Sequence, residues 1–524
     1  MLYWPNLQTQ RRLLIGLVCL RLVNALYLQT YAYPDEHWQA LEVAHRSAFG
    51  YGYLTWEWRE GIRSVLHPSV FAGLYRLLDV LGLADTALLF MAPKLLQGLI
   101  AAVGDWYACR FARRTFGSKS VPWMFLFTAV SWCHWFHAPR TLANSMEAAL
   151  SAAALFYWPW QAATKSLRIA LFIAAAACLL RPTGAVLWLF LGVELLVRSS
   201  ASRRWTICWN AAWILLGAML LTDYAYYGRW VFVPYEFIHV NIVRGISAFY
   251  GHHQWHWYFT QGAPALLTSV TPLVVYGMWL AKPALRTPGY ASFGLLMVYS
   301  MLAHKEFRFI YPVLPIGLAY AAHAAQAIWS WPLLQSRRSI RILCIAAIIL
   351  PNLILGPLLT TVHQRGVINV MDWLRVQPTL RSVGYLMPCH STPFWSRLHR
   401  RVPMWFLTCE PPASADELAS YVDEGDQFYA APATFLETRL NTTASVNVPK
   451  EPASTQQLDQ YAMQRWWPSH LVMFDALRPT VEDMLEKRGY HECARFFNSF
   501  FNDDSRRVGD VIVYCATVNS PSDE

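Results

Sequence analysis

Charged residues are scarce in this sequence. Only 15% of its 524 residues are Asp, Glu, Lys or Arg, whereas 55% are hydrophobic and 15% are aromatic. This balance excludes an ordinary soluble domain. The 25 Trp and 26 Tyr residues are typical of a protein with many membrane–water interfaces, where amphipathic rings accumulate.

Several motifs that would define other classes of protein are missing. No cysteine pair has C-x-x-C spacing, so we expect no zinc site. No Asp-x-Asp pair is present to hold the metal that a nucleotide-sugar donor needs, and no glycine-rich phosphate loop occurs in the polar C-terminal third. No convincing signal-peptide cleavage site is present, and Arg11 and Arg12 precede an apolar run that looks like a retained anchor with a cytosolic start. We expect neither a metal nor a cofactor.

The apolar runs predict a mainly α, polytopic membrane protein with about 11 transmembrane helices. The fifth and sixth runs are short, and Arg181 to Thr183 between them look like a turn buried within protein. Residues 67–83 are amphipathic and are expected to lie along the interface. The expected spans are 13–30, 88–109, 121–138, 145–162, 167–180, 184–198, 206–223, 265–281, 288–303, 309–331 and 342–361.

Charge predicts the orientation of these spans. The net charge is +10, and its Lys and Arg residues gather in alternate short loops that contain no acid. This pattern follows the positive-inside rule and does not indicate a nucleic-acid partner. It predicts a transmembrane catalytic domain over 1–361, with lumenal loops at 31–87 and 224–264, and a lumenal C-terminal domain over 362–524.

The C-terminal domain is expected to be a small α/β domain. Strand-like runs at 427–431, 471–474 and 511–514 alternate with a helical stretch at 481–488. The segment contains one glycosylation sequon, at Asn441. In an oxidising lumen its four cysteines can form two disulfides, with three pairings open. They are Cys389, Cys409, Cys493 and Cys515.

The unusual polar residues all fall on the predicted lumenal side, which favours a shared cavity for group transfer from a lipid phosphate. The cations expected to hold the phosphate are Arg140, Arg181, His304, Lys305 and Arg308. Asp35 is the expected base, with Glu36 beside it. Residues suited to bind acceptor or sugar are Gln39, Trp56, Glu57, Arg63, His67, His256 and Trp257.

Plainer interpretations remain for each group. Pro34 can start a helix, which would place Asp35, Gln39, Glu42 and Arg46 on one face. Two adjacent carboxylates would then lie at the mouth of the apolar layer, where ionisable groups are usually functional. The plainer interpretation is that Asp35 and Glu36 only complement the helix dipole. The less favoured interpretation of the cluster at 304–308 is an interfacial anchor. The histidines around His256 fit an interfacial aromatic loop or, less favourably, metal ligands.

Two motifs carry a family resemblance. Tyr33–Gln39 and His304–Phe309 resemble the paired signatures of the dolichol-phosphate-mannose-dependent α-mannosyltransferases of the endoplasmic reticulum, which have the GT-C fold. Residues 50–58, 61–64 and 386–393 resemble the branch that adds the third, α-1,2-linked mannose of the glycosylphosphatidylinositol (GPI) anchor. The resemblance implies a dolichyl-phosphate-mannose donor, a GPI-precursor acceptor and an inverting transfer at the lumenal face, with Asp35 as base.

Two other functions remain open on the sequence. One is an α-mannosyltransferase of lipid-linked N-glycan assembly, which has the same donor and another acceptor. The other is a polytopic lipid or sugar transporter, which would be expected to show inverted repeats and a midplane site. No such repeat is evident in the sequence, and it does not indicate a protein partner.

Overall fold

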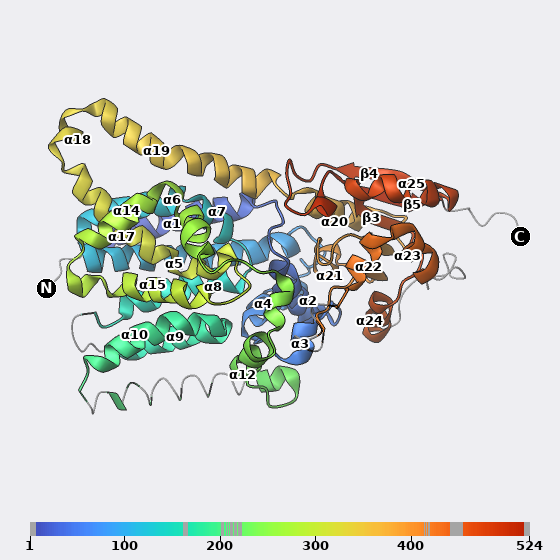
Figure 1. The fold of residues 1–524 in the computed structure, drawn as a ribbon, viewed down its shortest axis with the longest axis horizontal. Coiled ribbons are helices and arrows are strands. Elements are labelled where there is room, and N and C mark those ends of the chain that lie inside the picture. The colour runs from blue at the N-terminus through green and yellow to red at the C-terminus, as the bar shows by residue number, and fades with distance from the viewer. Residues whose placement is uncertain are drawn as a thin grey trace, which may run out of the picture. The chain divides into compact units, whose positions relative to one another are not determined.

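The computed structural model describes residues 7–160, 166–200, 223–412, 420–440 and 454–517, with single positions between 204 and 217 and at 414 and 417 (Figure 1). The described chain is mainly helical, as predicted. It divides into two compact units. Unit 1 contains residues 1–28, 60–67 and 91–358, and unit 2 contains residues 29–59, 68–90 and 359–524. The boundary after Leu358 lies near the expected one at 361, but two N-terminal segments join the C-terminal domain in unit 2.

Unit 1 is a bundle of helices that follow the predicted apolar runs. The seventh expected span, 206–223, lies largely outside the described residues. The main helices are α1 (Leu7–Tyr27), α5 (Leu88–Phe116), α6 (Val121–Val130), α7 (Trp132–His137), α8 (Ala143–Tyr157), α9 (Leu167–Leu180), α10 (Ala185–Val197), α14 (Thr271–Leu280), α15 (Thr287–Ser300), α17 (Leu314–Trp329) and α19 (Arg338–Pro357). Shorter helices are η2 (Ser118–Ser120), η3 (Pro182–Gly184), α12 (Val233–Ile238), η4 (His239–Val243), η5 (Ile246–Tyr250), η6 (Tyr258–Gly262), α13 (Ala263–Leu267), η7 (Thr268–Val270), η8 (Pro283–Leu285), α16 (Phe307–Ile310), η9 (Tyr311–Val313) and α18 (Pro332–Ser336).

Within the described residues, three helical stretches have both the length and the apolar composition to cross a membrane unaided. They are Leu88–Phe116, Tyr258–Leu280 and Arg338–Val376. The stretches Leu167–Leu180 and Pro182–Val197 are apolar but shorter, in keeping with the turn expected at Arg181, where the Gly184 N–H donates to the Arg181 carbonyl at 3.0 Å. Short spans are tolerated where neighbouring protein covers their ends.

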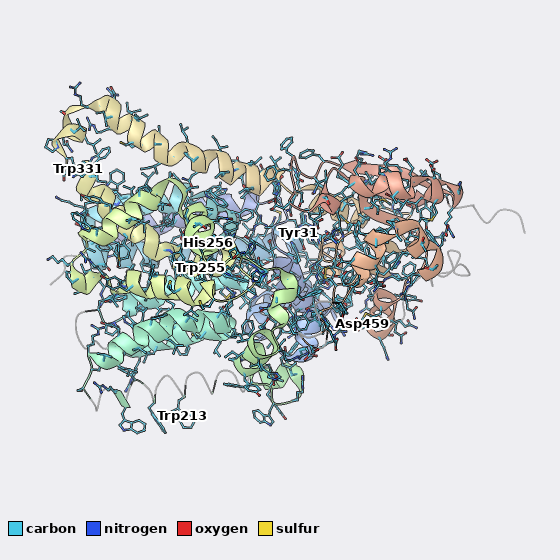
Figure 2. The ribbon with its side chains drawn as sticks, viewed as in Figure 1. Tyr31, Trp213, Trp255, His256, Trp331 and Asp459 are labelled. Carbon is cyan, nitrogen blue, oxygen red and sulfur yellow. A yellow bond between two sulfur atoms is a disulfide. The ribbon has the colours of Figure 1, made fainter. Side chains whose placement is uncertain are left out.

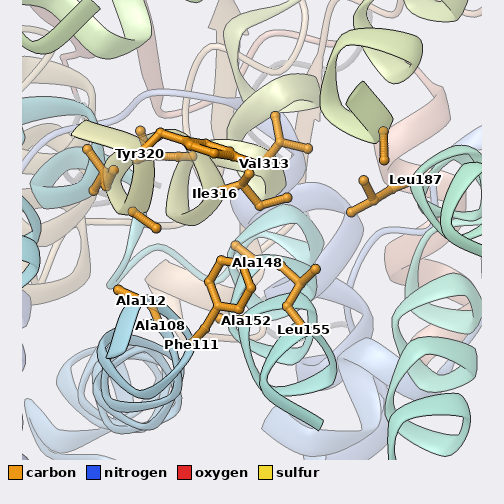
Figure 3. Close-up of a cluster of buried hydrophobic side chains, with 14 of the residues drawn as sticks. Ala108, Phe111, Ala112, Ala148, Ala152, Leu155, Leu187, Val313, Ile316 and Tyr320 are labelled. Atoms are coloured by element: carbon orange, nitrogen blue, oxygen red, sulfur yellow. The ribbon is translucent and has the colours of Figure 1, made fainter. Parts of the chain in front are cut away.

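Small residues let the helices of unit 1 approach closely. Figure 3 shows Ala108 and Ala112 of α5 facing Ala148 and Ala152 of α8, with Ile316 and Tyr320 of α17 above them. A Cβ placed on Gly104 of α5 would lie 2.7 Å from Ala149, so the two backbones meet where only glycine fits. Small residues at the contact are the usual means of packing helices in a membrane.

A buried polar network crosses the bundle. The Arg21 guanidinium on α1 donates to the Asp105 carboxylate on α5 at 2.6 Å, and to the Asn24 side chain at 3.0 Å. His134 on α7 lies 2.5 Å from the second Asp105 oxygen and 2.7 Å from the Tyr311 hydroxyl. All of these side chains are buried. Because isolated charges are costly at this depth, the pairing explains how α1 carries an arginine inside an apolar bundle.

Unit 2 is built on a five-stranded mixed sheet of order β2-β1-β3-β5-β4. Strand β1 (Val383–Leu386) runs parallel to β2 (Met404–Phe406) and β3 (His470–Phe474), and β5 (Val511–Ala516) runs antiparallel to β3 and to β4 (Tyr490–Phe496). Its helices are η1 (Glu36–Leu41), α2 (Glu42–Phe49), α3 (Trp56–Glu60), α4 (Leu66–Val80), η10 (Leu358–Val362), α20 (Gly366–Val376), α21 (Trp395–Leu398), α22 (Glu424–Ala430), α23 (Pro432–Arg439), α24 (Thr455–Met463), η12 (Asp475–Leu477), α25 (Arg478–Lys487) and η13 (Ser505–Arg507).

The central strands are buried on both faces. Val472 and Phe474 of β3 enter one apolar cluster, and Leu471 and Met473 enter another on the opposite face. This alternation follows from the period of two in a strand. The first cluster also contains Trp38 from η1, so the N-terminal acidic motif is packed into the core of the C-terminal domain.

The α/β character, β3, β5 and the helix at 481–488 agree with the predictions. The expected strand at 427–431 is wrong, because residues 427–430 belong to helix α22 (Glu424–Ala430) and Ala431 is its C-cap. Asp423 caps that helix by accepting the Asp426 N–H at 2.7 Å, a start signal that outweighs the short apolar run. Helix α4 matches the amphipathic stretch, and it leaves Leu77 and Val80 exposed.

We predict that Asp105→Asn strongly destabilises the protein. The substitution leaves the Arg21 guanidinium buried without its carboxylate, a change that typically costs about 3 to 5 kcal/mol. Thermal unfolding of the detergent-solubilised protein measures this, and the double variant Arg21→Met, Asp105→Asn should recover most of the loss. A single variant as stable as the parent would show that the ion pair is dispensable.

Candidate active site

The acidic motif Tyr33–Gln39 forms an irregular turn. The chain is helical from Pro34, and Glu36–Leu41 form the π-helix η1, with Asp35 at its N-cap position. Single π turns are rare and often mark functional sites. The residues after Asp35 do not keep α-helical spacing in this wider turn. Asp35, Gln39, Glu42 and Arg46 therefore do not share one helix face, as an uninterrupted α-helix would have placed them. Asp35 is half-buried and Glu36 is buried.

Trp38 anchors this turn. Its indole N–H donates to the Thr392 carbonyl at 2.9 Å, and its ring packs 4.3 Å from His390 and 5.2 Å from Phe394. Tyr31, just before the motif, donates its hydroxyl to the His390 carbonyl and stacks on His37 at 5.3 Å. Asp35 and Glu36 are therefore held by residues more than 350 positions later in the chain.

The other polar residues expected on the same face are structural. The Glu42 carboxylate accepts the Ser396 N–H at 2.6 Å and the Tyr53 N–H at 3.2 Å, and burial raises its pKa to about 7. Arg46 pairs with Asp459 at 2.8 Å. Gln39 differs from them, since its amide donates to the Glu57 carboxylate at 2.6 Å. The structure thus brings together two of the residues predicted to bind acceptor.

A cleft in unit 2 contains a third such residue, Trp56. Burial lowers the pKa of its neighbour His390 to about 4, while the charge of Asp35 raises that pKa and the charge of Arg507 lowers it. His390 is therefore neutral at physiological pH and lies within electrostatic reach of the predicted base. The cleft is lined by Tyr53, Thr55, Trp56, His390, Phe406, Thr408, Cys409 and Glu410.

His390 was not predicted as a site residue, nor were Thr408, Glu410 and Arg507. The local signal is that His390 adopts a left-handed backbone with φ of 56°, a conformation that is uncommon outside glycine and is often found at functional sites. Its neighbours are distant in sequence, so no spacing pattern joins them.

The structure pairs Cys389 with Cys409 and Cys493 with Cys515. The first bond ties the His390 loop to the strand-edge segment that carries Thr408. His390 and the two sulfurs lie within 4.8 Å of one another, but sulfurs joined in a disulfide do not serve as thiolate ligands. Asn441 lies outside the described residues.

The second motif, His304–Phe309, lies in unit 1 and runs from the loop after α15 into α16. Glu306 accepts from Arg308 at 2.6 Å and lies 2.9 Å from His304. Burial raises the pKa of Glu306, but Arg308 and His304 outweigh it and hold that pKa at about 2. Lys305 donates to the His253 carbonyl at 2.9 Å, and burial lowers its pKa. The carboxylate fixes the orientation of the cations around it.

Two of the predicted phosphate-binding arginines lie beside the same ring of this motif. The guanidinium carbons of Arg181 and Arg308 lie 5.3 and 5.4 Å from the centre of the Phe309 ring. Arg181 also pairs with Glu147 at 3.2 Å, and the Asn144 amide donates to the Arg308 carbonyl at 2.8 Å. Arg140 is buried, with its guanidinium 4.2 Å from the Phe136 ring. Arginine side chains held in fixed positions are suited to bind an anion such as phosphate.

The remaining predicted binders also lie in unit 1. Trp257 is buried and packs 4.9 Å from Phe307, so it supports the motif rather than offering an open face. His256 lies beside Trp255, whose ring is exposed (Figure 2). The Arg63 carbonyl accepts the Tyr227 hydroxyl at 2.6 Å, and burial lowers the pKa of His67 to about 3.

Solved structures define the fold class. The chain resembles ArnT from Cupriavidus metallidurans bound to undecaprenyl phosphate, with a TM-score of 0.55, 12% identity, and coverage of 98% of this chain and 99% of that one. It also resembles the mycobacterial arabinofuranosyltransferase AftD, with a TM-score of 0.51, 16% identity, and coverage of 97% and 40%. The fold is that of the GT-C glycosyltransferases, membrane proteins with many apolar helices.

Sequence comparison identifies the protein family within this fold class. Residues 12–399 match the Alg9-like mannosyltransferase family, and this chain belongs to that family. GPI mannosyltransferase 3 of Yarrowia lipolytica is 40% identical over 96% of each chain. GPI alpha-1,2-mannosyltransferase 3 of Mus musculus is 33% identical over 95% of this chain and 88% of its own. The chain is therefore an α-mannosyltransferase, as predicted.

We predict that Glu306→Gln lowers thermal stability by an amount that depends on pH. A carboxyl group whose folded pKa of about 2 lies below its ordinary value of 4.5 stabilises the fold above pH 4.5 and loses that effect as the pH falls toward 2. The difference in unfolding temperature from the parent should be constant between about pH 5 and 8 and shrink below that range. Glu486→Gln, at an exposed position of α25, is the matched control. A difference that grew on acidification would contradict the assignment.

Proposed function

We propose that this chain transfers the third, α-1,2-linked mannose from dolichyl-phosphate-mannose to the GPI-anchor precursor, on the lumenal side of the endoplasmic reticulum membrane. The observation that carries the proposal is identity of 33 to 40% over nearly the whole length of relatives named for GPI mannosyl transfer. The paired motifs and the positive-inside pattern of the loops support the donor and the side of the membrane.

In this proposal the cations of unit 1 bind the donor phosphate. Arg140, Arg181, Lys305 and Arg308 supply fixed positive charge, and Glu306 orients Arg308 toward the ligand. Charge develops on the phosphate as the sugar departs, so preorganised cations stabilise the transition state more than the ground state. They also serve the neutralising role that a metal has for nucleotide-sugar donors, and we expect transfer to be insensitive to chelators.

Asp35 acts as the base. It accepts the proton of the acceptor 2-hydroxyl as that oxygen attacks the anomeric carbon, the bond to phosphate breaks, and dolichyl phosphate leaves with the electron pair. This single displacement inverts a β-linked donor to an α-linked product and forms no sugar–enzyme bond. Glu36, Gln39 and Glu57 would orient the acceptor, since the Gln39–Glu57 hydrogen bond places an amide and a carboxylate next to the Asp35 turn.

The rim of the cleft in unit 2 would contact the acceptor glycan, since the cleft itself has a volume of about 10 Å³ and is too small to enclose a sugar ring. Trp56 offers an aromatic face for a sugar ring, while Thr55, Thr408 and neutral His390 offer hydrogen bonds to hydroxyls. The cleft also contains Glu410, whose carboxylate accepts from Arg59. Apolar and polar groups in this mixture are typical of carbohydrate sites.

The direct test supplies purified protein with labelled dolichyl-phosphate-mannose and a two-mannose GPI precursor. Formation of an α-1,2-linked three-mannose product supports the proposal. Transfer instead to a lipid-linked N-glycan precursor, with none to the GPI precursor, would assign the chain to the other α-mannosyltransferase pathway.

We predict that Asp35→Asn lowers the rate of transfer by at least about 100-fold, because general-base catalysis typically contributes that much or more. Membrane insertion and unfolding temperature should stay at parental values, since Asn preserves the shape of the side chain. Asp483→Asn, at an exposed position of α25, should transfer at the parental rate. Parental activity in Asp35→Asn would remove this residue from the mechanism.

We predict that Trp56→Ala raises the KM for the GPI precursor by about 10-fold, equivalent to about 1.4 kcal/mol, and leaves the KM for the donor unchanged. The matched control is Trp331→Ala, which removes an exposed indole just before α18 (Figure 2). It should change neither the KM for the GPI precursor nor the KM for the donor. An equal rise in both KM values would argue that Trp56 shapes the fold rather than the acceptor site.

A further inference from the structure

The loop between β4 and β5 carries three exposed phenylalanines. Phe497, Phe500 and Phe501 are 45%, 75% and 58% exposed, and the rings of Phe497 and Phe500 lie 4.9 Å apart. We refer to these three residues as the Phe loop. Burial of large apolar side chains is normally favourable, so such a cluster on the surface indicates a binding partner.

The Phe loop is fastened to the segment that follows the last apolar helix. The Arg365 N–H donates to the Asn498 carbonyl at 3.2 Å, and the His363 ring stacks on Phe501 at 4.7 Å. A Cβ on Gly366 would lie 2.9 Å from the Phe497 carbonyl oxygen, so the two backbones are in direct contact. The segment 363–366 begins one residue after η10, which continues α19.

The same segment is joined to the residues that leave the first apolar helix. The Gln29 N–H donates to the Thr360 carbonyl at 2.8 Å, and the Tyr31 N–H donates to the Gln364 carbonyl at 3.0 Å. Helix α1 ends at Tyr27, only two residues before Gln29. The segments that follow the first and last apolar helices are therefore hydrogen-bonded to each other, and the Phe loop is attached to the second of them.

From this position we infer that the Phe loop inserts into the bilayer surface, at the boundary between headgroups and acyl chains. Aromatic side chains accumulate at that depth. The segment to which the Phe loop is attached follows α19 within a few residues and is hydrogen-bonded to the segment that follows α1, so the chain keeps it close to the ends of these two apolar helices. The partner is the lipid rather than another protein, because attachment to the membrane-exit segments places the lipid within reach of the loop in every molecule. The contact would fix the C-terminal sheet against the membrane.

Spin-label accessibility tests the inference in the full-length protein reconstituted in phosphatidylcholine vesicles. A nitroxide is attached to Phe500→Cys or, independently, to Phe501→Cys, with the exposed Cys19 and Cys344 replaced by Ser. Met463→Cys, an exposed apolar position of α24 away from the loop in sequence, is the matched control. Collision rates with oxygen, which concentrates in lipid, and with a water-soluble nickel chelate are compared. Unaltered elution and thermal unfolding establish that each labelled protein is folded.

We expect oxygen collisions to dominate at positions 500 and 501 and nickel collisions to dominate at 463. Adding Phe501→Asp to the label at 500 should shift that label toward the nickel pattern, because a carboxylate disfavours the acyl boundary. A nickel pattern at both loop positions in the parent would overturn the inference, as would protection from both reagents, which would mean that protein covers the loop. Neither reading depends on mannosyl transfer, so this test fails or succeeds separately from the proposed function.

Discussion

The buried pair of Arg21 and Asp105 is the constraint on which unit 1 depends. An arginine in the first apolar helix is tolerable only if α5 presents a carboxylate at the same depth, and Asp105 in turn accepts from His134. His134 meets the hydroxyl of Tyr311, five residues past Glu306 in the cationic motif, and His137 stacks on the Tyr311 ring at 4.8 Å. A chain of polar contacts thus connects the first helix to the segment that carries Arg308, and satisfies each buried group along the way.

The two motifs are held by different means. The cationic motif is short and largely self-contained, since Glu306 orients Arg308 and His304 within five residues. The acidic motif is anchored through Trp38, which packs into a sheet made from the other end of the chain. The first arrangement fixes cations through one carboxylate, and the second positions the Asp35 turn through the apolar contacts of Trp38.

The sequence was sufficient for the fold class, the family and the order of the helices, because apolar runs and alternating loop charge are local signals. Three features of the structure could not be predicted from the sequence. The π turn at 36–41 follows from tertiary anchoring of Trp38, which no periodicity reveals. The role of His390 depends on neighbours brought in by a disulfide and a sheet. Glu42 and Arg46 have the residue types of a binding site, yet their partners at Ser396 and Asp459 make them supports for the fold.

The dependence of Trp38 on Thr392 and Phe394 also has a consequence for biogenesis. During synthesis the tryptophan is made long before the strands that will cover it, and at ribosomal rates the interval is on the order of tens of seconds. Throughout that time the turn bearing Asp35 lacks its core. The turn that bears Asp35 is therefore completed late in folding. A truncated or stalled nascent chain would expose the apolar surface around Trp38 to the quality-control machinery of its compartment.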